Sequence, residues 1–267
     1  MQTQISENLK AHNRLAFAYE SRHPEIYNKI EQNRLHDSLQ MAVSAIQTDG
    51  FEKKALDFGC GAGNLTQHLL DLGLNVVAAD LSDIFLKLVK NKFNHAAKLQ
   101  TAKLNGEDLG NFADNSFDFI ATYSVLHHVP DYLTVVDEFV RVIKPGGIIY
   151  IDHEVNENYW SQSEELKELY KFKQNPKVLF RIFKLRTWIN KFRALMNPRF
   201  QEEGDIHVWA DDHIEWSKIE EIVTSKGCEI VSKSDYLSFD KRYPTEVWQQ
   251  QKNNLTDMSC LIARKFK

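Results

Sequence analysis

Three glycines alternate with other residues in the segment ALDFGCGAGNLT, residues 55–66, directly after a short apolar run. Glycine weakens helices and strands, so such a cluster indicates a tight turn or a place where a ligand approaches the backbone closely. The spacing of Gly59, Gly61 and Gly63 is shorter than that of a dinucleotide-binding G-x-G-x-x-G pattern, and no Gly-Lys-Ser/Thr of a phosphate-binding loop follows. A carboxylate ligand with an adjacent ammonium group would suit this turn better than a pyrophosphate.

Two aspartates accompany the glycines. Asp57 or the carbonyl of Gly59 can accept a hydrogen bond from an ammonium group, and N–H groups at the start of the next helix can face a carboxylate. Asp80 ends the next predicted strand, which is the usual place for a carboxylate that accepts from both hydroxyls of a ribose. The structural alternative is that the glycines only shorten the turn and that Asp80 caps the following helix.

Histidines follow two further predicted strands. His127 and His128 come after the strand 117–124, and His153 comes after the strand 147–152. Because imidazole titrates near neutrality, His127 and His153 are candidate catalytic bases, together with Tyr123 at the end of its strand. The alternative for His128 is a helix-start residue bonded to the backbone. No spacing resembles a zinc site or a two-histidine, one-carboxylate site, so the sequence predicts no metal.

The elements that must position these residues alternate between strand and helix from residue 54 onwards. Strands are expected at 54–59, 75–80, 100–104, 117–124, 147–152, 228–233 and near 259–265, and helices at 64–72, 83–92, 132–142 and 213–226. Residues 144–147 are expected to form a turn, and residues 236–243 a polar, aromatic loop. Such alternation predicts an α/β fold with a doubly wound, mostly parallel, seven-stranded sheet.

The domain organisation follows from where this alternation is interrupted. Residues 1–50 are predicted to form a helical N-terminal arm, 51–152 and 211–267 the sheet domain, and 153–210 a helical insertion after the fifth strand that caps a substrate. Within the insertion, residues 177–199 form a basic amphipathic pattern. This pattern is typical of a lid helix, and also of a helix that contacts an anionic membrane surface peripherally.

Composition limits the cellular setting and the partners. The net charge of −4 gives no reason to expect a nucleic-acid partner. The three cysteines form no paired framework, and the N-terminus lacks the apolar core of a signal peptide, so we expect a cytoplasmic protein. No run reaches the ~20 apolar residues of a membrane span. We expect a monomer or a homodimer.

Five ordered motifs give a family resemblance: ALDFGCGAGNLT, VVAADLS, NGEDL, DNSFDFIATYSVLHHV and RVIKPGG. Together they resemble the class I S-adenosylmethionine-dependent methyltransferases, in particular the small-molecule, type 11-like branch, and they imply a Rossmann-like methyltransferase fold. One departure is Asn105, which stands where that family often has an acidic residue. The resemblance implies S-adenosylmethionine as the cofactor, converted to S-adenosylhomocysteine, and the following cofactor-binding residues: Asp57, Gly59, Cys60, Gly61, Gly63, Asp80, Leu81, Gly106, Glu107, Asp108 and Thr122.

The expected reaction is transfer of a methyl group, by in-line displacement, to an oxygen of a small or lipid-like acceptor, and less readily to a nitrogen or carbon. The candidate residues of the acceptor pocket are mostly aromatic: Tyr19, Tyr27, His128, Trp160 and Trp209. Two alternatives stay open, namely an RNA or protein methyltransferase and a non-catalytic module that binds S-adenosylmethionine. The sequence does not identify the acceptor.

Overall fold

The structure is a computed structural model of the whole chain, and it describes residues 9–10, 13, 16, 19–173 and 205–266. The predicted amphipathic helix at 177–199 lies outside the described residues. None of the described helices combines the length and the apolar character that a membrane span requires.

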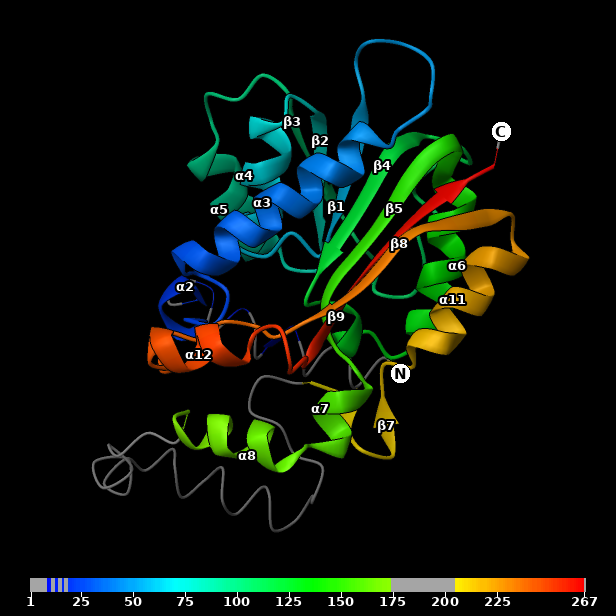
Figure 1. Cartoon of the computed structure of the whole chain (residues 1–267). Coiled ribbons are helices and arrows are strands. Elements are labelled where there is room, and N and C mark those ends of the chain that lie inside the picture. Colours follow the sequence, from blue (N-terminus) through cyan, green and yellow to red (C-terminus); the bar gives the residue numbers. More distant parts are fainter. Residues whose placement is uncertain (1–8, 11–12, 14–15, 17–18, 174–204, 267) are drawn as a thin grey trace.

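A seven-stranded sheet with the strand order β3-β2-β1-β4-β5-β9-β8 forms the centre of the molecule (Figure 1). The neighbours from β3 to β5 are parallel, whereas β9 is antiparallel to both β5 and β8. The predicted mostly parallel, doubly wound sheet is therefore confirmed. The strands are β1 (Lys54–Phe58), β2 (Asn75–Asp80), β3 (Leu99–Lys103), β4 (Phe117–Tyr123), β5 (Ile143–Val155), β8 (Cys228–Tyr236) and β9 (Met258–Lys265).

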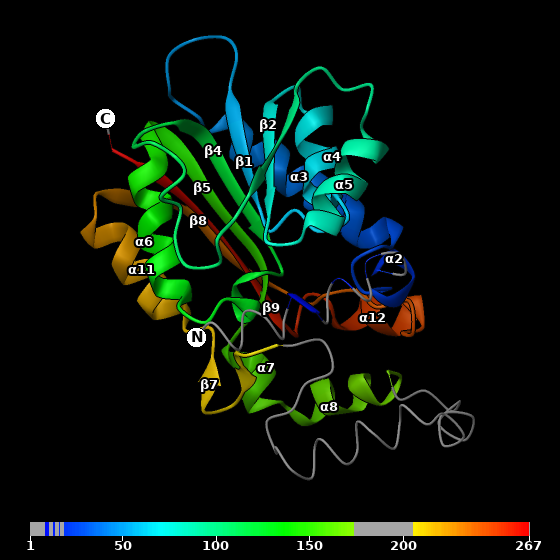
Figure 2. The same cartoon turned by 180° about the vertical axis from the view of Figure 1, so that it is seen from behind.

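Helices cover both faces of this sheet (Figures 1 and 2). On one face lie α3 (Lys29–Ser44), α4 (Asn64–Asp71) and α5 (Asp83–Lys92), and on the other α6 (Tyr132–Val142) and α11 (Trp216–Ser225). Side chains of a strand alternate between faces, so in β4 Phe119 packs with the α3 and α4 side and Ile120 with the α6 and α11 side. Two buried apolar layers result.

The helix starts follow from their capping residues. Ser82 Oγ accepts a hydrogen bond from the Phe85 N–H at 3.2 Å, and Asp131 Oδ1 accepts one from the Thr134 N–H at 3.0 Å. Each cap satisfies a backbone donor that the first helical turn leaves without a partner. Helices α5 and α6 consequently begin at the predicted residues.

Three sequence predictions of local structure need correction. The predicted turn at residues 144–147 lies inside β5 as an irregularity, because the pairing with β4 shifts between Phe117 and Phe119. Tyr236 belongs to β8, and the segment after it contains the helix α12 (Thr245–Gln251) as well as a loop. Helix α11 starts later than predicted, because Asp212–His213 form β7, which pairs with β6 (Val208–Trp209).

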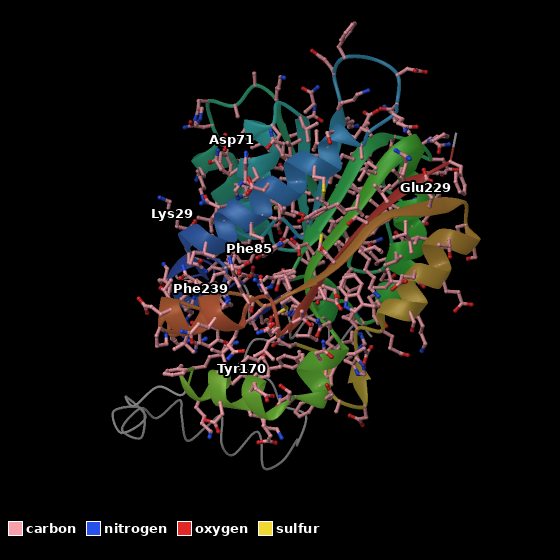
Figure 3. The ribbon with its side chains drawn as sticks, viewed as in Figure 1. Lys29, Asp71, Phe85, Tyr170, Glu229 and Phe239 are labelled. Atoms are coloured by element: carbon pink, nitrogen blue, oxygen red, sulfur yellow. The ribbon has the colours of Figure 1, made fainter. Side chains whose placement is uncertain are left out.

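Short helices and a satellite core lie beyond the carboxyl ends of the strands. The helices are α2 (Tyr19–Arg22), the 3₁₀ helix η2 (Leu126–His128), α7 (Glu157–Ser161) and α8 (Glu164–Lys171). Figure 3 labels Tyr170, which belongs to α8, and Phe239, which lies near α12. Phe239 packs with Leu166 of α8 and Trp248 of α12 in a small apolar cluster. This cluster joins the segment after β5 to the segment between β8 and β9.

Candidate functional site

The glycine loop joins β1 to α4 at the carboxyl edge of the sheet. All three of its glycines have left-handed backbones, with φ of 74° at Gly59, 47° at Gly61 and 86° at Gly63. A Cβ at Gly59 would lie 2.6 Å from the Val125 side chain, and one at Gly63 would lie 2.7 Å from Phe93. A Cβ at Gly61 would meet nothing closer than 4.0 Å. Two glycines are thus required by packing, and Gly61 faces open space.

The N–H groups of this loop are largely used within the fold. Those of Gly59 and Cys60 donate to the Ala79 carbonyl at 2.9 and 3.0 Å, and that of Gly63 donates to the Cys60 carbonyl at 2.8 Å. The Gly61 N–H donates to Asp80 Oδ2 at 2.9 Å. These four N–H groups already have partners within the fold, so they do not donate to a ligand. The loop contributes mainly a stretch of backbone that has no side-chain atoms at Gly61.

Asp80 connects the glycine loop to the next helix. Besides the Gly61 N–H, its carboxylate accepts the Ser82 N–H through Oδ1 at 2.7 Å. Burial raises the pKa of Asp80, while these backbone hydrogen bonds oppose that shift. Each carboxylate oxygen has two lone pairs, so both oxygens can still accept a hydrogen bond from a ligand. Ser82, and not Asp80, is the N-cap of α5, which removes the structural alternative for Asp80.

The large cleft is a space of about 890 Å³ beside Asp80. Leu9 and Tyr19 from the N-terminal arm form part of its wall. Other residues that line the large cleft include Gly59, Gly61, Asp80, Leu81, Gly106, Glu107, Asp108, Ser124, Val125, His128, Val129 and Pro130.

The small cavity adjoins the large cleft on the other side of Gly61. Both spaces share Tyr19, Gly59, Gly61, Ser124 and Val125 in their walls. Tyr27, Asp57, Cys60, Asn64 and Tyr123 line the small cavity alone. The two spaces therefore adjoin at these five shared residues of the glycine loop, the N-terminal arm and the end of β4.

Three buried polar atoms of residues that line the small cavity have no hydrogen-bond partner within the described residues, namely Asp57 Oδ1, Asn64 Nδ2 and the Tyr123 hydroxyl. The other Asp57 oxygen accepts the Thr66 hydroxyl at 2.5 Å. Burial raises the pKa of Asp57 to about 7, and nearby Asp80 adds to the effect. Buried polar atoms nearly always have partners, so an acceptor and a donor left over beside one cavity indicate a ligand with both functions.

Most of the predicted cofactor residues lie in these two spaces. Gly63 is buried against Phe93, and Thr122 is buried in β4, so neither lines the large cleft or the small cavity. Asn105 organises its own loop, since its Oδ1 accepts the Glu107 N–H at 2.8 Å.

The predicted acceptor residues are less concentrated. Tyr19 and His128 line the large cleft and Tyr27 lines the small cavity, whereas Trp160 and Trp209 line neither. The Trp160 ring packs on His213 with ring centroids 5.0 Å apart, and Trp209 lies in β6.

His127 is held by a glutamate that sequence reasoning did not identify. Its Nδ1 lies 2.8 Å from Oε2 of Glu154, which is 2% exposed. The other Glu154 oxygen accepts the N–H groups of Val125 at 2.9 Å and Leu126 at 2.7 Å. Glu154 therefore fixes both the η2 turn and the orientation of the His127 ring.

His153 is buried without hydrogen-bond partners. It is 5% exposed, and within the described residues neither of its ring nitrogens makes a hydrogen bond. Its φ of 63° is left-handed, and its position coincides with a register shift between β5 and β9. The ring stacks on Tyr123 with centroids 4.6 Å apart. Burial lowers the pKa of His153 to about 4, so the ring is neutral at pH 7. Its left-handed backbone, its burial and its unmet hydrogen bonds keep His153 a candidate functional residue.

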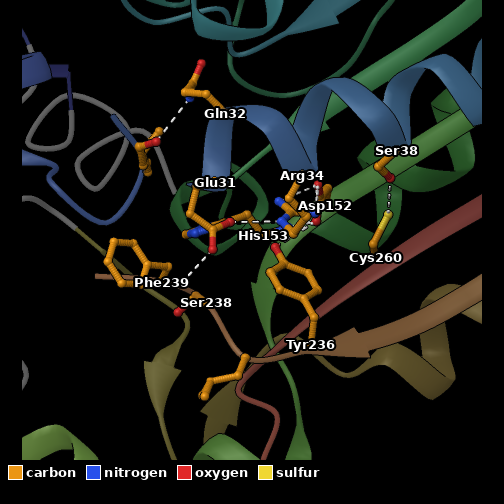
Figure 4. Close-up of polar contacts among 12 residues, drawn as sticks. Glu31, Gln32, Arg34, Ser38, Asp152, His153, Tyr236, Ser238, Phe239 and Cys260 are labelled. Atoms are coloured by element: carbon orange, nitrogen blue, oxygen red, sulfur yellow. Dashed lines mark hydrogen bonds and ion pairs between the residues drawn. The ribbon is translucent and has the colours of Figure 1, made fainter. Parts of the chain in front are cut away.

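A buried ionic network lies behind His153 (Figure 4). Arg34 of α3 donates to Glu31 Oε2 at 2.8 Å and, through both terminal nitrogens, to Asp152 Oδ2 at 3.1 Å. Asp152 also accepts the hydroxyls of Tyr150 at 2.5 Å and Tyr236 at 2.9 Å. The network joins the N-terminal arm to β5 and β8, and so fixes the strand that carries His153.

Sequence reasoning missed Asn64, Glu154, Asp152 and Arg34 as contributors to this region. Asn64 carries a local signal, because it is the first residue of the helix that follows the glycine loop. Glu154 and Asp152 are charged residues in an otherwise apolar strand, which is a recognisable pattern.

Comparisons with known proteins give a consistent family signal over part of the chain. A family model described as a methyltransferase domain, type 11, matches residues 56–151. A ubiquinone biosynthesis O-methyltransferase of Thiobacillus denitrificans is 34% identical over 99 residues, which cover 37% of this chain and 43% of that protein. A demethylmenaquinone methyltransferase of Bacillus licheniformis is 31% identical over 137 residues, covering 46% and 58%. The chain thus spans about half the length of these relatives.

A solved structure resembles nearly the whole chain. An S-adenosylmethionine-dependent methyltransferase from Methanosarcina mazei superposes with a TM-score of 0.54 at 20% identity, covering 85% of this chain and 97% of that one. At this identity the likeness supports the fold.

Proposed function

Because residues 56–151 form a domain of the type 11 branch of the class I S-adenosylmethionine-dependent methyltransferases, we propose that the protein transfers a methyl group from S-adenosylmethionine to a small, lipid-like acceptor. The large cleft would hold the adenosine part of the cofactor and the small cavity its methionine part. The polar atoms of the residues present fit this group.

The observation that carries the proposal is that Asp57 Oδ1 and Asn64 Nδ2, both of residues that line the small cavity, are buried without hydrogen-bond partners within the described residues. Asp57 Oδ1 can accept from the ammonium group of the cofactor, and Asn64 Nδ2 can donate to its carboxylate. Asp80 lies across Gly61 in the large cleft, where its oxygens can accept from the ribose hydroxyls. Left-handed Gly61 keeps the wall between these groups free of side-chain atoms.

When bound, S-adenosylmethionine supplies a methyl group on a positively charged sulfur, from which a neutral thioether departs. The residues of the chain then mainly have to align donor and acceptor and exclude water. Such positioning supplies about 7–11 kcal/mol of the barrier reduction at best. Ser124 and Val125 line both spaces, and Val129 and Pro130 add an apolar rim to the large cleft. We propose that the acceptor enters over this rim.

We propose an oxygen nucleophile on a ring that carries an apolar chain. One relative is named a ubiquinone biosynthesis O-methyltransferase, which supports an oxygen nucleophile, and the other is named a demethylmenaquinone methyltransferase, which supports a quinone-type acceptor but names no atom. His153 lines neither space, but its ring stacks on Tyr123, which lines the small cavity, and we propose that the acceptor reaches these two residues next to the sulfonium. A neutral imidazole can orient a hydroxyl group without placing a second positive charge beside the sulfonium.

The first test compares the affinity of the Asp57→Asn variant and of the natural protein for S-adenosylmethionine. Removing one partner of a buried charged pair costs about 2–5 kcal/mol, and asparagine keeps the shape of the site, so we expect a loss of about 2 kcal/mol, or roughly 30-fold in affinity. In the natural protein, affinity for S-adenosylmethionine should rise with pH up to about 7, because only the ionised carboxylate attracts the ammonium group. Calorimetric titration across pH measures both effects.

The matched ligand for this test is methylthioadenosine, which lacks the amino-acid end. Its affinity should not change in Asp57→Asn. The raised pKa means that the folded state binds the Asp57 proton more tightly than the unfolded state does, so the free energy of unfolding of the ligand-free protein falls as pH rises from 3.8 to about 7. The variant lacks this penalty and should be at least as stable at pH 7. Equal losses for both ligands would contradict the assignment of Asp57.

The second test concerns the acceptor and His153. Purified protein with labelled S-adenosylmethionine should methylate a prenylated phenol, and mass spectrometry with NMR of the product identifies the methylated atom. His153→Phe keeps the stacking on Tyr123 but removes both nitrogens, so kcat/KM should fall roughly 5- to 150-fold, corresponding to about 1–3 kcal/mol for a lost buried hydrogen bond.

The control for His153→Phe is the affinity for S-adenosylmethionine, which should not change. A parallel loss of that affinity and of thermal stability would show a purely structural role. Binding of the cofactor without turnover of any acceptor would favour a non-catalytic binding module. A salt-dependent transfer to tRNA would favour the RNA methyltransferase alternative.

A further inference from the structure

Three side chains that can ligate a metal ion meet at the rim of the large cleft. His127 and His128 are neighbours in η2, and Asp205 comes from the end of the insertion. One ligand atom from each residue lies within 4.8 Å of the other two, and all three residues are half-buried. Among the described residues, no other group of three histidine, cysteine or carboxylate residues meets this distance criterion. The sequence predicts no metal because no spacing in it resembles a known metal site, and Asp205 is far from the histidines along the chain.

The distances and the chemistry of these groups suit a transition metal. His128 Nδ1 lies 3.1 Å from Asp205 Oδ1. Two atoms that bind a tetrahedral ion at about 2.1 Å lie roughly 3.4 Å apart, so this spacing is close to that of two ligands of one ion. Two imidazoles with one carboxylate favour zinc and related ions, whereas magnesium and calcium prefer oxygen ligands alone.

Glu154 gives a second, independent indication. A histidine that ligates a metal usually donates its other ring N–H to a carboxylate, which fixes the tautomer. Glu154 accepts from His127 Nδ1 at 2.8 Å, and its own position is fixed by the Val125 and Leu126 N–H groups. In the neutral ring, Nε2 then carries the lone pair that a metal needs.

We propose that His127, His128 and Asp205 bind one divalent transition-metal ion of the zinc class, with Glu154 as the outer partner of His127. Because His128 also lines the large cleft, the ion would lie where the acceptor enters. Its role rests on the proposed function: an acceptor hydroxyl that coordinates the ion releases its proton to water more readily, which prepares the oxygen for methylation.

Direct metal binding tests the proposal. Full-length protein is freed of metal with a chelator, dialysed against Zn²⁺ or Mg²⁺, and analysed by mass spectrometry of the elements. We expect one Zn²⁺ per chain and no retained Mg²⁺. Co²⁺ serves as a spectroscopic probe, since its visible absorption reports coordination by nitrogen and oxygen. Less than stoichiometric Zn²⁺ at micromolar concentration would overturn the proposal.

Variants separate ligands from neighbours. His128→Ala and Asp205→Asn should lose more affinity than the roughly 10- to 100-fold expected for Glu154→Gln, which removes only an outer partner. Glu154→Gln keeps an oxygen for the Val125 and Leu126 N–H groups. The control is His95→Ala, an exposed histidine after α5, at the opposite edge of the sheet, where binding should be unchanged.

The unfolding midpoint and the affinity for S-adenosylmethionine are measured in parallel with metal binding. Unfolding midpoints of the metal-free variants should match that of the natural protein, which excludes misfolding as the cause of lost binding. If His128→Ala and Asp205→Asn bind Zn²⁺ like the natural protein, His128 and Asp205 form an ordinary ion pair and the inference fails. S-adenosylmethionine binding by the metal-free protein is titrated separately, so failure of the metal site and failure of the proposed function give different results.

Discussion

A Gly61→Arg variant should lose detectable binding of S-adenosylmethionine. The position faces open space in the wall of both the large cleft and the small cavity, so an arginine side chain would enter the volume that the cofactor needs. Its positive charge would also oppose the sulfonium, and like charges brought together cost several kcal/mol. We expect a loss above about 4 kcal/mol, or roughly 1,000-fold, measured by calorimetry.

Gly73→Arg is the matched control for this variant. Gly73 is also left-handed, with φ of 84°, and no atom lies within 4 Å of a Cβ placed there, but it is exposed after α4 and outside both spaces. Both variants therefore carry a similar backbone penalty of about 1–2 kcal/mol in stability. Only Gly61→Arg should lose the ligand. Retained binding in Gly61→Arg would remove the glycine loop from the cofactor site.

Replacing Arg34 with methionine should lower the free energy of unfolding by about 3–5 kcal/mol. Arg34 neutralises two carboxylates, Glu31 at 1% and Asp152 at 0% exposure, and its guanidinium lies 3.9 Å from the centre of the Tyr236 ring. Methionine fills much of the volume but leaves both acids without the cation. Chemical denaturation followed by circular dichroism measures the change.

Lys92→Met is the comparison for an exposed pair. Lys92 lies 2.9 Å from Glu20, and their side chains are 42% and 55% exposed. Exposed pairs contribute about 0–1 kcal/mol, so this variant should unfold almost like the natural protein. If Arg34→Met and Lys92→Met lost equal stability, the buried network would not hold the arm to the sheet.

Much of the fold could be predicted because its local signals agree with its tertiary contacts. Residues 83–92 and 132–142 each combine a capping residue with one apolar face, and the structure begins and ends both helices as predicted. Helix α12 escaped prediction because it is short and buries only Trp248, so it has no periodic apolar stripe. The β5 boundary was wrong because the glycines and proline at 144–147 favour a turn locally, while pairing with β4 makes them part of the strand.

The candidate site likewise has a part that could be predicted from the sequence and a part that could not. Asp57, Asp80 and the glycine loop follow one another within two strand–helix units, so their proximity can be predicted from local order. Glu154 and Asp205 reach His127 and His128 only through the tertiary fold. No local pattern encodes that meeting, and the sequence alone therefore could not predict a shared ligand set.

The position of β9 has a consequence for synthesis in the cell. β9 lies between β5 and β8, although it is made after both. Its pairing partners include Asp152 and Glu154, the residues that support Arg34 and His127. A nascent chain on the ribosome that has finished β8 therefore still exposes one edge of β5, and such an edge readily pairs with other chains. Translation has to pass residue 258 before the end of β5 can pair with β9 in its final register. Only then can the site that Asp152 and Glu154 support take its final form.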